Sequence, residues 1–446
     1  MAAVGQTGLL TAAAPVAPLG GHPLVMLLTQ LSLLIVCAYL LGRLANRVGL
    51  PAVVGELSVG VLLGPSVFGN LAPGASDWLF PRDAGQFHLL DSIAQLGVLL
   101  LVGVTGISLD FSLVRRRGGT VLWTSLLGLT IPFGLGVGVA MTLLPGTLRP
   151  GNTQPLVFAL FLGVALCVSA IPVIAKTLLD MGLIHRNVGQ IILAAGTMDD
   201  VVGWLLLSVV SAMAVDGLHT GTVVEPILHL IGLLLVLILL GRPLVRAAMR
   251  WAQRSESSAA VVVTAVAVIL MCATGTAALG LEPVFGALLG GILISTSSTV
   301  SLSSLAPLNN GLSAVLAPVF FATAGLRMDM RALVHPTVLA GALLILGVAI
   351  LGKFTGAVLG GLTGGLNRWE VLALGAGMNA RGVVQLVVAS VGLRLGVLNT
   401  ESYTIIVLTA VITSVMAPPL LRIATRHLEV TVDEESRRRM MEPLLD

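Results

Sequence analysis

The sequence predicts an all-α integral membrane protein of about thirteen transmembrane helices, and three observations predict it. Of the 446 residues, 56% are hydrophobic and 10% are charged, whereas ordinary soluble domains carry about 25% charged residues. The mean hydropathy is +1.02. The apolar residues stand in long runs, and about 20 such residues cross a bilayer as a helix. This composition excludes a soluble enzyme, a disordered regulator and a secreted disulfide-bonded scaffold.

Thirteen hydrophobic runs follow one another along the chain. We predict spans at residues 24–45, 52–69, 90–108, 120–144, 155–179, 188–213, 222–240, 259–279, 284–297, 312–325, 338–362, 369–391 and 402–421. Residues 1–23 lack the basic start of a signal peptide, so we expect an extracellular N-terminal segment and a true first span. Residues 422–446 form a short charged tail, which we expect to be cytoplasmic and disordered or peripheral.

The basic residues predict the orientation of the spans. With the loops assigned alternately to the two sides, one side carries seventeen arginines and lysines and the other side carries five. Basic residues gather in cytoplasmic loops. The N-terminus is therefore expected outside and the C-terminus inside, in a multi-pass protein of the cell (plasma) membrane.

Two pairs of segments indicate an internal repeat. GELSVGVLLGPS in the second span matches GALLGGILISTS in the ninth, and GISLDFSLV after the third matches GLRMDMRAL after the tenth. A shift of seven spans is odd, so the two copies are inverted, as in many secondary transporters. We predict a transmembrane transporter domain over 24–421, with one repeat at about 24–213, a linker helix at about 222–240 and a second repeat at about 259–421.

The sixth span carries two adjacent carboxylates at its middle, Asp199 and Asp200 in GTMDDVVGW. A charge at this depth is costly and usually functional. Neighbouring helical residues point about 100° apart, so one carboxylate can face an aqueous cavity while the other faces a protein partner. A structural buried pair is the alternative.

Two cations lie at similar depth in later spans. Lys353 is near the middle of the eleventh span, and Asp199 or Asp200 is its expected partner. A purely structural salt bridge is the alternative, and it is compatible with a bridge that opens when an ion enters. Arg381 in the twelfth span either neutralises the carbonyl end of a helix or pairs with a carboxylate.

The fifth and twelfth spans are repeat counterparts, and both contain helix breakers near their centres. CVSAIPVIAK contains Pro172, and GAGMNARGVVQ contains three glycines. Proline removes a helical hydrogen bond, and two interrupted helices at matching positions are the best sequence pointer to a substrate site. Ser169 and Asn379 are expected to line that site with oxygens.

The remaining features exclude other chemistry. The three cysteines share no metal or disulfide spacing, and a net charge of +3 is too small and scattered for nucleic-acid binding. No nucleotide motif or catalytic triad is present, so we expect neither an enzyme nor a bound cofactor.

On these residues the chain resembles the monovalent cation:proton antiporters, the superfamily of bacterial Na⁺/H⁺ and K⁺/H⁺ exchangers. The resemblance runs from about 24 to 421 and is carried by PAVVGELSVGVLLGPS, SAIPVIAKTLLDMGLI, GTMDD, FFATAGLRMDM and LGKFTG. It implies a homodimer, in which a dimer domain supports a core domain with two crossing broken helices. We expect a Kef/Nap-like branch without a nucleotide-binding regulatory domain, although the NARGVVQ segment is more similar to other branches, including the plant cation exchangers.

The resemblance also assigns roles to residues. Asp200 matches the carboxylate that carries the cation and the proton, and Asp199 matches the neighbour that pairs with the core lysine, which we expect to be Lys353. Asp200 and Asp199 are therefore the expected ligands of the transported Na⁺ or K⁺. The expected function is exchange of this cation for protons across the membrane by alternating access.

Three alternatives stay open on the sequence. A cation channel or uniporter on the same scaffold would pass current without proton counterflow. An organic-ion exporter would need a roomier aromatic cavity, and aromatic residues are 4% of the chain. A non-transporting sensor would not need the charged residues at midplane depth.

Overall fold

The computed structural model describes residues 20–81, 84–108, 118–216, 228, 231–255, 257–296 and 302–435, and within them every regular element is helical. The long helices are α1 (Gly21–Arg47), α5 (Ala84–Ser108), α7 (Gly118–Thr142), α10 (Asn187–Asp216), α13 (Ser258–Ala278), α17 (Pro336–Thr363) and α20 (Thr400–Thr425), and the short helix α2 (Ala52–Leu63) begins a further apolar segment that ends at Leu71. The shorter helices are α3 (Phe68–Leu71), α4 (Pro73–Leu79), α8 (Pro155–Cys167), α9 (Ile171–Asp180), α12 (Arg242–Arg254), α14 (Pro283–Ser295), α15 (Ala306–Gly311), α16 (Ala317–Leu326), α18 (Arg368–Met378) and α19 (Val383–Arg394). Single turns of 3₁₀ or π-helix are η1 (Gly146–Leu148), η2 (Leu237–Gly241), η3 (Leu302–Leu305), η4 (Leu312–Leu316) and η5 (Met330–Val334).

Ten helices in the described part of the chain are long and apolar enough to cross a membrane. The helices α18 and α19, bent by 42° at their break, meet the same criteria together and count as an eleventh span if the pair crosses as one; α8 and α14 are shorter apolar helices. The span predicted at 222–240 lies partly outside the described residues, and the helix found there runs over Ile231–Arg254. The count of thirteen stays a prediction.

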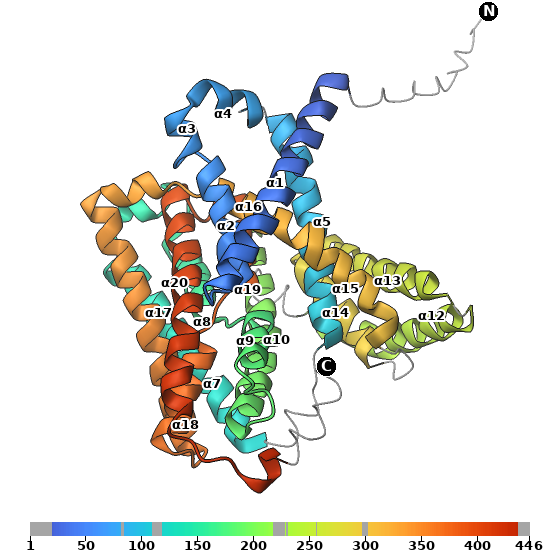
Figure 1. The fold of residues 1–446 in the computed structure, drawn as a ribbon, viewed down its shortest axis with the longest axis vertical. Helices are drawn as coiled ribbons and strands as arrows, with labels where there is room; N and C mark the ends of the chain where they lie inside the picture. The colour runs from blue at the N-terminus through green and yellow to red at the C-terminus, as the bar shows by residue number, and fades with distance from the viewer. Residues whose placement is uncertain are drawn as a thin grey trace, which may run out of the picture.

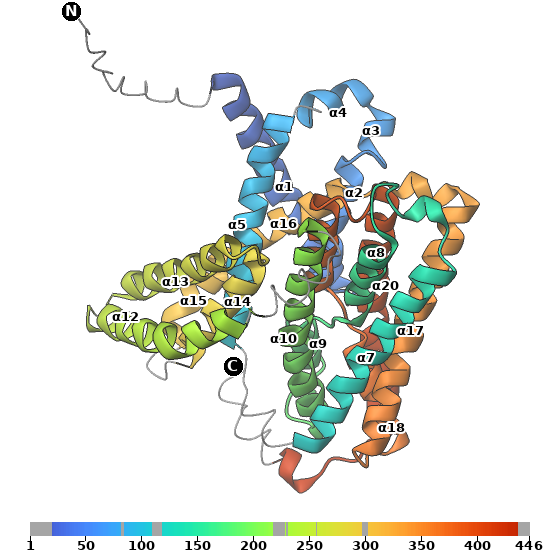
Figure 2. The same ribbon diagram turned by 180° about the vertical axis from the view of Figure 1, so that it is seen from behind.

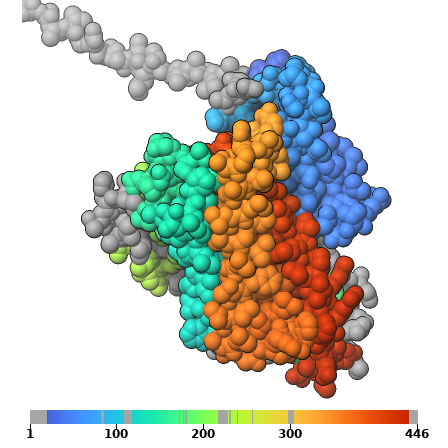
Figure 3. All heavy atoms as spheres, turned by 90° about the vertical axis from the view of Figure 1, so that its left-hand side faces the viewer, coloured from blue at the N-terminus to red at the C-terminus, as the bar shows by residue number. Residues whose placement is uncertain are grey.

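The helices pack in two groups (Figure 1). The scaffold group consists of α1, α2, α5, α13, α14 and α16, and the core group consists of α7, α8, α9, α10, α17, α18, α19 and α20. Both ribbon views place α12, α13 and α15 to one side of the upright core helices (Figure 2). Figure 3 looks onto the opposite face, where α7, α17 and α20 lie side by side.

Glycines let the scaffold helices cross closely. A Cβ at Gly60 of α2 would lie 2.0 Å from a backbone oxygen of α16, and one at Gly325 of α16 would lie 2.2 Å from a backbone oxygen of α2. The same mutual approach recurs between α14 and α5. A Cβ at Gly291 of α14 would lie 2.0 Å from a backbone oxygen of α5, and one at Gly106 of α5 would lie 2.5 Å from a backbone oxygen of α14. Small residues permit this backbone contact between membrane helices. Each crossing therefore requires glycine on both helices.

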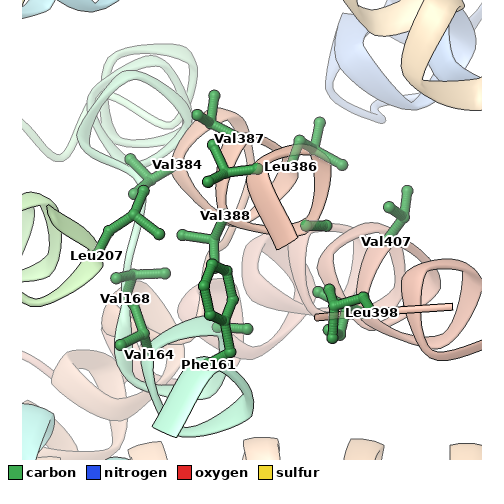
Figure 4. Packing of buried hydrophobic residues seen from close by; sticks show 14 of the residues in the cluster. Phe161, Val164, Val168, Leu207, Val384, Leu386, Val387, Val388, Leu398 and Val407 are labelled. Carbon is green, nitrogen blue, oxygen red and sulfur yellow. The ribbon is translucent and has the colours of Figure 1, made fainter. Parts of the chain in front are cut away.

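Apolar packing joins two short helices of the core group, α8 and α19. Phe161, Val164 and Val168 lie against Val384 and Val388 at the start of α19 (Figure 4). In membranes such close packing, rather than hydrophobic exclusion from water, holds helices together. It places the ends of α8 and α19 in direct contact.

The first part of the charged tail is docked on the core group. The Arg186 guanidinium, before α10, donates to the carbonyls of Leu428 and Glu429 at 3.0 Å and lies 3.2 Å from the Glu434 carboxylate. The Asn187 amide donates to the same carboxylate at 2.6 Å. Residues 436–446 lie outside the described part.

Candidate functional site

Two interrupted helices cross at the centre of the core group. α8 ends at Cys167 and α9 begins at Ile171, while α18 ends at Met378 and α19 begins at Val383. The Ala170 N–H donates to the Ala380 carbonyl at 3.2 Å, so the two breaks touch. Pro172 is the second residue of α9, a position where a missing N–H costs no helical bond. The break therefore precedes the proline.

Four helix ends converge at this crossing. Free carbonyls carry partial negative charge at the C-terminal ends of α8 and α18, and free amides carry partial positive charge at the N-terminal ends of α9 and α19. The residues of both breaks are buried. The crossing thus offers backbone groups of both signs away from bulk water.

Asp199 of α10 is fully buried and fully paired. One carboxylate oxygen accepts from the Lys353 Nζ of α17 at 2.7 Å and lies 3.0 Å from the Ser169 hydroxyl. The other oxygen accepts from the Ser125 hydroxyl of α7 at 2.9 Å. The Lys353 side chain is also fully buried. Asp199 and Lys353 therefore form a closed ion pair between α10 and α17.

Asp200 is equally buried but differently surrounded. Neither of its carboxylate oxygens has a formed hydrogen bond within the described residues, although the backbone amide of Ile171 at the start of α9 interacts with it. A buried carboxylate without partners is costly. Asp200 is thus the member of the pair whose oxygens are not bound by any side chain of the described part.

Ser169 and Asn379 stand in the two breaks. The Ser169 hydroxyl lies between the Asp199 carboxylate and the Met378 carbonyl, at 3.0 and 2.9 Å. The Asn379 side chain is fully buried, and both of its amide atoms lack partners within the described residues. The structure brings Ser169 to Asp199 and leaves the Asn379 amide as a second unsatisfied group.

Arg381 contacts helix backbone rather than a carboxylate. Its guanidinium donates to the Ala165 carbonyl at 3.4 Å, in the last turn of α8, and to the Ala349 carbonyl of α17 at 2.9 Å. Its own carbonyl accepts from the Ser414 hydroxyl. The positive charge of Arg381 therefore lies at the negative, C-terminal end of α8. Its second acceptor, the Ala349 carbonyl, is about one turn of α17 from Lys353.

The sequence reading missed Ser125, which satisfies the second oxygen of Asp199. Ser125 lies in an apolar helix 74 residues before its partner. Its signal is weak, because small hydroxyl residues are common in membrane helices and most bond their own helix.

A cavity of about 630 Å³ separates the two groups on one side of the crossing, which we call the Arg422 side. Scaffold residues Asn46 and Glu56 and core residues Val173, Thr177 and Arg422 are among those that line it. Val173 lies in the first turn of α9, so the cavity reaches the edge of the crossing.

On the other side, which we call the Arg394 side, the two groups touch. Arg394 of α19 pairs with Glu282 before α14 at 2.7 Å. The Tyr403 hydroxyl of α20 donates to the Ala324 carbonyl of α16 at 2.8 Å. The interface is thus open on the Arg422 side and closed on the Arg394 side.

No group of three or more histidine, cysteine, aspartate or glutamate side chains in the described part could hold a metal ion. The crossing instead offers one free carboxylate, an amide and backbone carbonyls. Oxygen ligands of this kind suit hard cations.

The chain is similar to proteins named as antiporters. It is 29% identical over 404 residues to the Na(+)/H(+) antiporter NhaS4 of Synechocystis, covering 90% of this chain and 97% of that protein. It is 28% identical over 395 residues to the Na(+)/H(+)-K(+) antiporter GerN of Bacillus cereus, covering 88% and 95%. It is 31% identical over 410 residues to Cation/H(+) antiporter 20 of Arabidopsis thaliana, covering 88% of this chain and 48% of that protein. The chain therefore spans about half the length of the plant relative.

A solved structure shares the fold. The sodium proton antiporter MjNhaP1 of Methanocaldococcus jannaschii superposes with a TM-score of 0.63 at 16% identity, covering 91% of this chain and 97% of that one. With the ten apolar helices, this fold makes the chain a multi-pass membrane protein. The family described as sodium/hydrogen exchanger, transmembrane, matches residues 32–426. The chain therefore belongs to the transmembrane sodium/hydrogen exchanger family.

Proposed function

We propose that this protein is a secondary antiporter that exchanges a monovalent cation, Na⁺ or K⁺, for protons. Its relatives are named Na⁺/H⁺ and K⁺/H⁺ antiporters, which supports this substrate class. The cation and the proton compete for Asp200, and the protein presents that residue alternately to the two sides of the membrane.

The observation that carries the proposal is the contrast between two adjacent carboxylates. Asp199 has three partners on its two oxygens, whereas Asp200 has no formed hydrogen bond in the described part. A carboxylate in a half-dry site is stabilised by a proton or by a partly dehydrated cation, but it cannot hold both well. Competition for one group couples the two fluxes without a separate gate.

The neighbouring charges fit supporting roles. Lys353 neutralises Asp199, so the site carries one negative charge, at Asp200, when it is empty and deprotonated. Arg381 stabilises the negative end of α8, which keeps the crossing intact. Ser169 and Asn379 and the backbone carbonyls near Pro172 supply neutral oxygens beside the free carboxylate.

The difference between the two sides of the interface supports alternating access as part of the proposal. By the distribution of basic residues, the Arg422 side is cytoplasmic, so the structure is open to the inside. Movement of the core group against the scaffold group would close the 630 Å³ cavity and separate Arg394 from Glu282.

The glycine crossings support the inverted repeat. Gly60 on α2 meets Gly325 on α16, and their repeat mates Gly291 on α14 and Gly106 on α5 meet in the same way. We retain thirteen spans, an outer N-terminus, a cytoplasmic C-terminus and the domain bounds 24–421 as part of the proposal. We also propose that the protein forms a homodimer joined through the scaffold group and surrounded by membrane lipid.

The test uses purified protein in liposomes with an imposed pH gradient and a pH-sensitive dye inside. Na⁺, K⁺ and Li⁺ are added in turn to the parent, to Asp200→Asn and to Asp77→Asn, a matched carboxylate change on α4. Cation-dependent collapse of the gradient is expected with the parent and with Asp77→Asn, and none with Asp200→Asn.

Exchange by Asp200→Asn at the parental rate would refute the proposal. Current at fixed pH without proton counterflow would favour a channel or uniporter. Collapse of the gradient only with organic ions would favour an exporter of organic ions.

A further inference from the structure

A line of buried polar groups begins at the Asp200 carboxylate, which only the Ile171 amide approaches, and continues along one face of α10. The next members are the Trp204 indole N–H and the hydroxyls of Ser208 and Ser211, which have no hydrogen-bond partner in the described part of the chain. All four side chains are at most 4% exposed. Buried polar groups are normally hydrogen-bonded, and leaving one unsatisfied is costly. Four in a row on one helix therefore need an explanation.

Helical geometry places the four groups in one stripe. Steps of four, four and three residues keep them within an arc of about 80°. The stripe rises about 16 Å from Asp200 to Ser211, which is about half of the ~30 Å hydrocarbon thickness. It ends near Asp216, the last residue of α10.

The direction of the stripe is fixed by the ends of α10. Its N-terminal end is bound to the tail that follows α20, through Arg186 and Leu428, and so lies on the Arg422 side. The stripe runs the other way, from Asp200 toward the Arg394 side. It lies on the side where the interface is closed, away from the 630 Å³ cavity.

Many other hydroxyls in the described part avoid the same cost locally, although those of Thr124 and Thr323 do not. Thr197, one turn before the stripe on α10, donates to the Leu193 carbonyl at 2.9 Å. Thr409 on α20 donates to the Ile405 carbonyl at 2.8 Å. This bond to a carbonyl four residues earlier is the usual solution for serine and threonine in membrane helices. Ser208 and Ser211 do not use it, so their hydroxyls remain available to another partner.

We propose that the Trp204–Ser208–Ser211 face of α10 lines the ion and proton path between Asp200 and the Arg394 side. The inference rests on the proposed function and adds the residues of the outer half of the path. The serine oxygens bind the partly dehydrated cation or the water that accompanies it. The Trp204 indole, one turn from Asp200, fills the path in the present state and donates its N–H to water when the path opens.

The experiment measures cation affinity separately from each side. Ser208→Ala/Ser211→Ala is compared with the parent in inside-out and right-side-out membrane vesicles, with Na⁺ or K⁺ as the added cation and a pH-sensitive dye as the readout. The KM for cation added on the Arg394 side is expected to rise at least fivefold. The KM for cation added on the Arg422 side is expected to stay within twofold of the parental value. Thr409→Val, which removes a buried hydroxyl that bonds its own helix, should change neither.

Thermal stability separates a transport role from a structural one. Removal of two unsatisfied hydroxyls should leave the Tm of the purified protein unchanged or higher. Parental KM values on both sides would overturn the inference, and so would an equal rise on both sides together with a lower Tm. Asp200→Asn separates the two hypotheses. If only the assignment of the serine path is wrong, Asp200→Asn still abolishes exchange. If the proposed function itself is wrong, Asp200→Asn still exchanges cations for protons.

Discussion

Replacing Lys353 with methionine should destabilise the protein more than a loss of packing would explain. The side chains of Lys353 and Asp199 are both 0% exposed and lie 2.7 Å apart. Methionine fills nearly the same volume but leaves Asp199 as a buried charge held only by the hydroxyls of Ser125 and Ser169. Breaking a buried pair by removing one partner costs about 3–5 kcal/mol. At roughly 2 °C per kcal/mol, the Tm should fall by roughly 6–10 °C.

The companion variants test the reason for that loss. Asp199→Asn leaves the Lys353 ammonium buried without its carboxylate, so a similar loss of stability is expected. The double variant Asp199→Asn/Lys353→Met removes both charges and should recover most of the lost stability, because no unpaired charge remains. Tm values from thermal unfolding in detergent provide the double-mutant cycle. A Lys353→Met protein as stable as the parent, or a double variant that loses the sum of both single losses, would refute the argument.

Two further predictions concern helix packing and the tail. Gly325→Ala should lower the Tm by several degrees, because the new Cβ would lie 2.2 Å from a backbone oxygen of α2. Gly347→Ala on α17 is the control: its new Cβ meets open space, so the Tm should stay the same or rise slightly. Equal Tm values for the two variants would contradict the close crossing. Burial alone would raise the pKa of Glu434, but the amides of Asn187 and Thr431 and the Arg186 guanidinium together lower it. The docking of the tail is therefore expected to persist above the usual glutamate pKa of about 4.3 and to weaken as the pH falls through the lowered value. Limited proteolysis of the tail at a series of pH values measures its docking. At neutral pH, Glu434→Gln should be cleaved faster than the parent. Equal cleavage of the two proteins at neutral pH would show that the Glu434 carboxylate does not hold the tail.

Much of the fold could be predicted from local sequence. The lengths of the apolar runs locate the described membrane helices, since a bilayer demands about 20 apolar residues per crossing. The motifs placed the chain near the cation:proton antiporters, and the family match confirms that resemblance. The helix that follows the predicted start of the span at 222–240 extends to Arg254, because the arginine-rich α12 continues it beyond the apolar residues.

The candidate site was only partly accessible from the sequence. Asp199, Asp200, Lys353 and Arg381 stood out because a charge in an apolar span is costly. Their partners could not be assigned, because the pair of Asp199 and Lys353 joins residues 154 positions apart. Ser125 and the stripe of Ser208 and Ser211 carry no such signal, since serine is ordinary in membrane helices.

Hydropathy and helix breaking are local properties, so the amino-acid sequence alone identifies a membrane protein with charged residues inside apolar spans and two interrupted spans. Contacts between distant helices settle that Asp199 rather than Asp200 pairs with Lys353, and that Arg381 meets the end of α8 rather than a carboxylate within the described residues. Adjacent residues on a helix point about 100° apart. What each of them meets therefore depends on neighbouring helices, whose positions are set by packing across the whole chain.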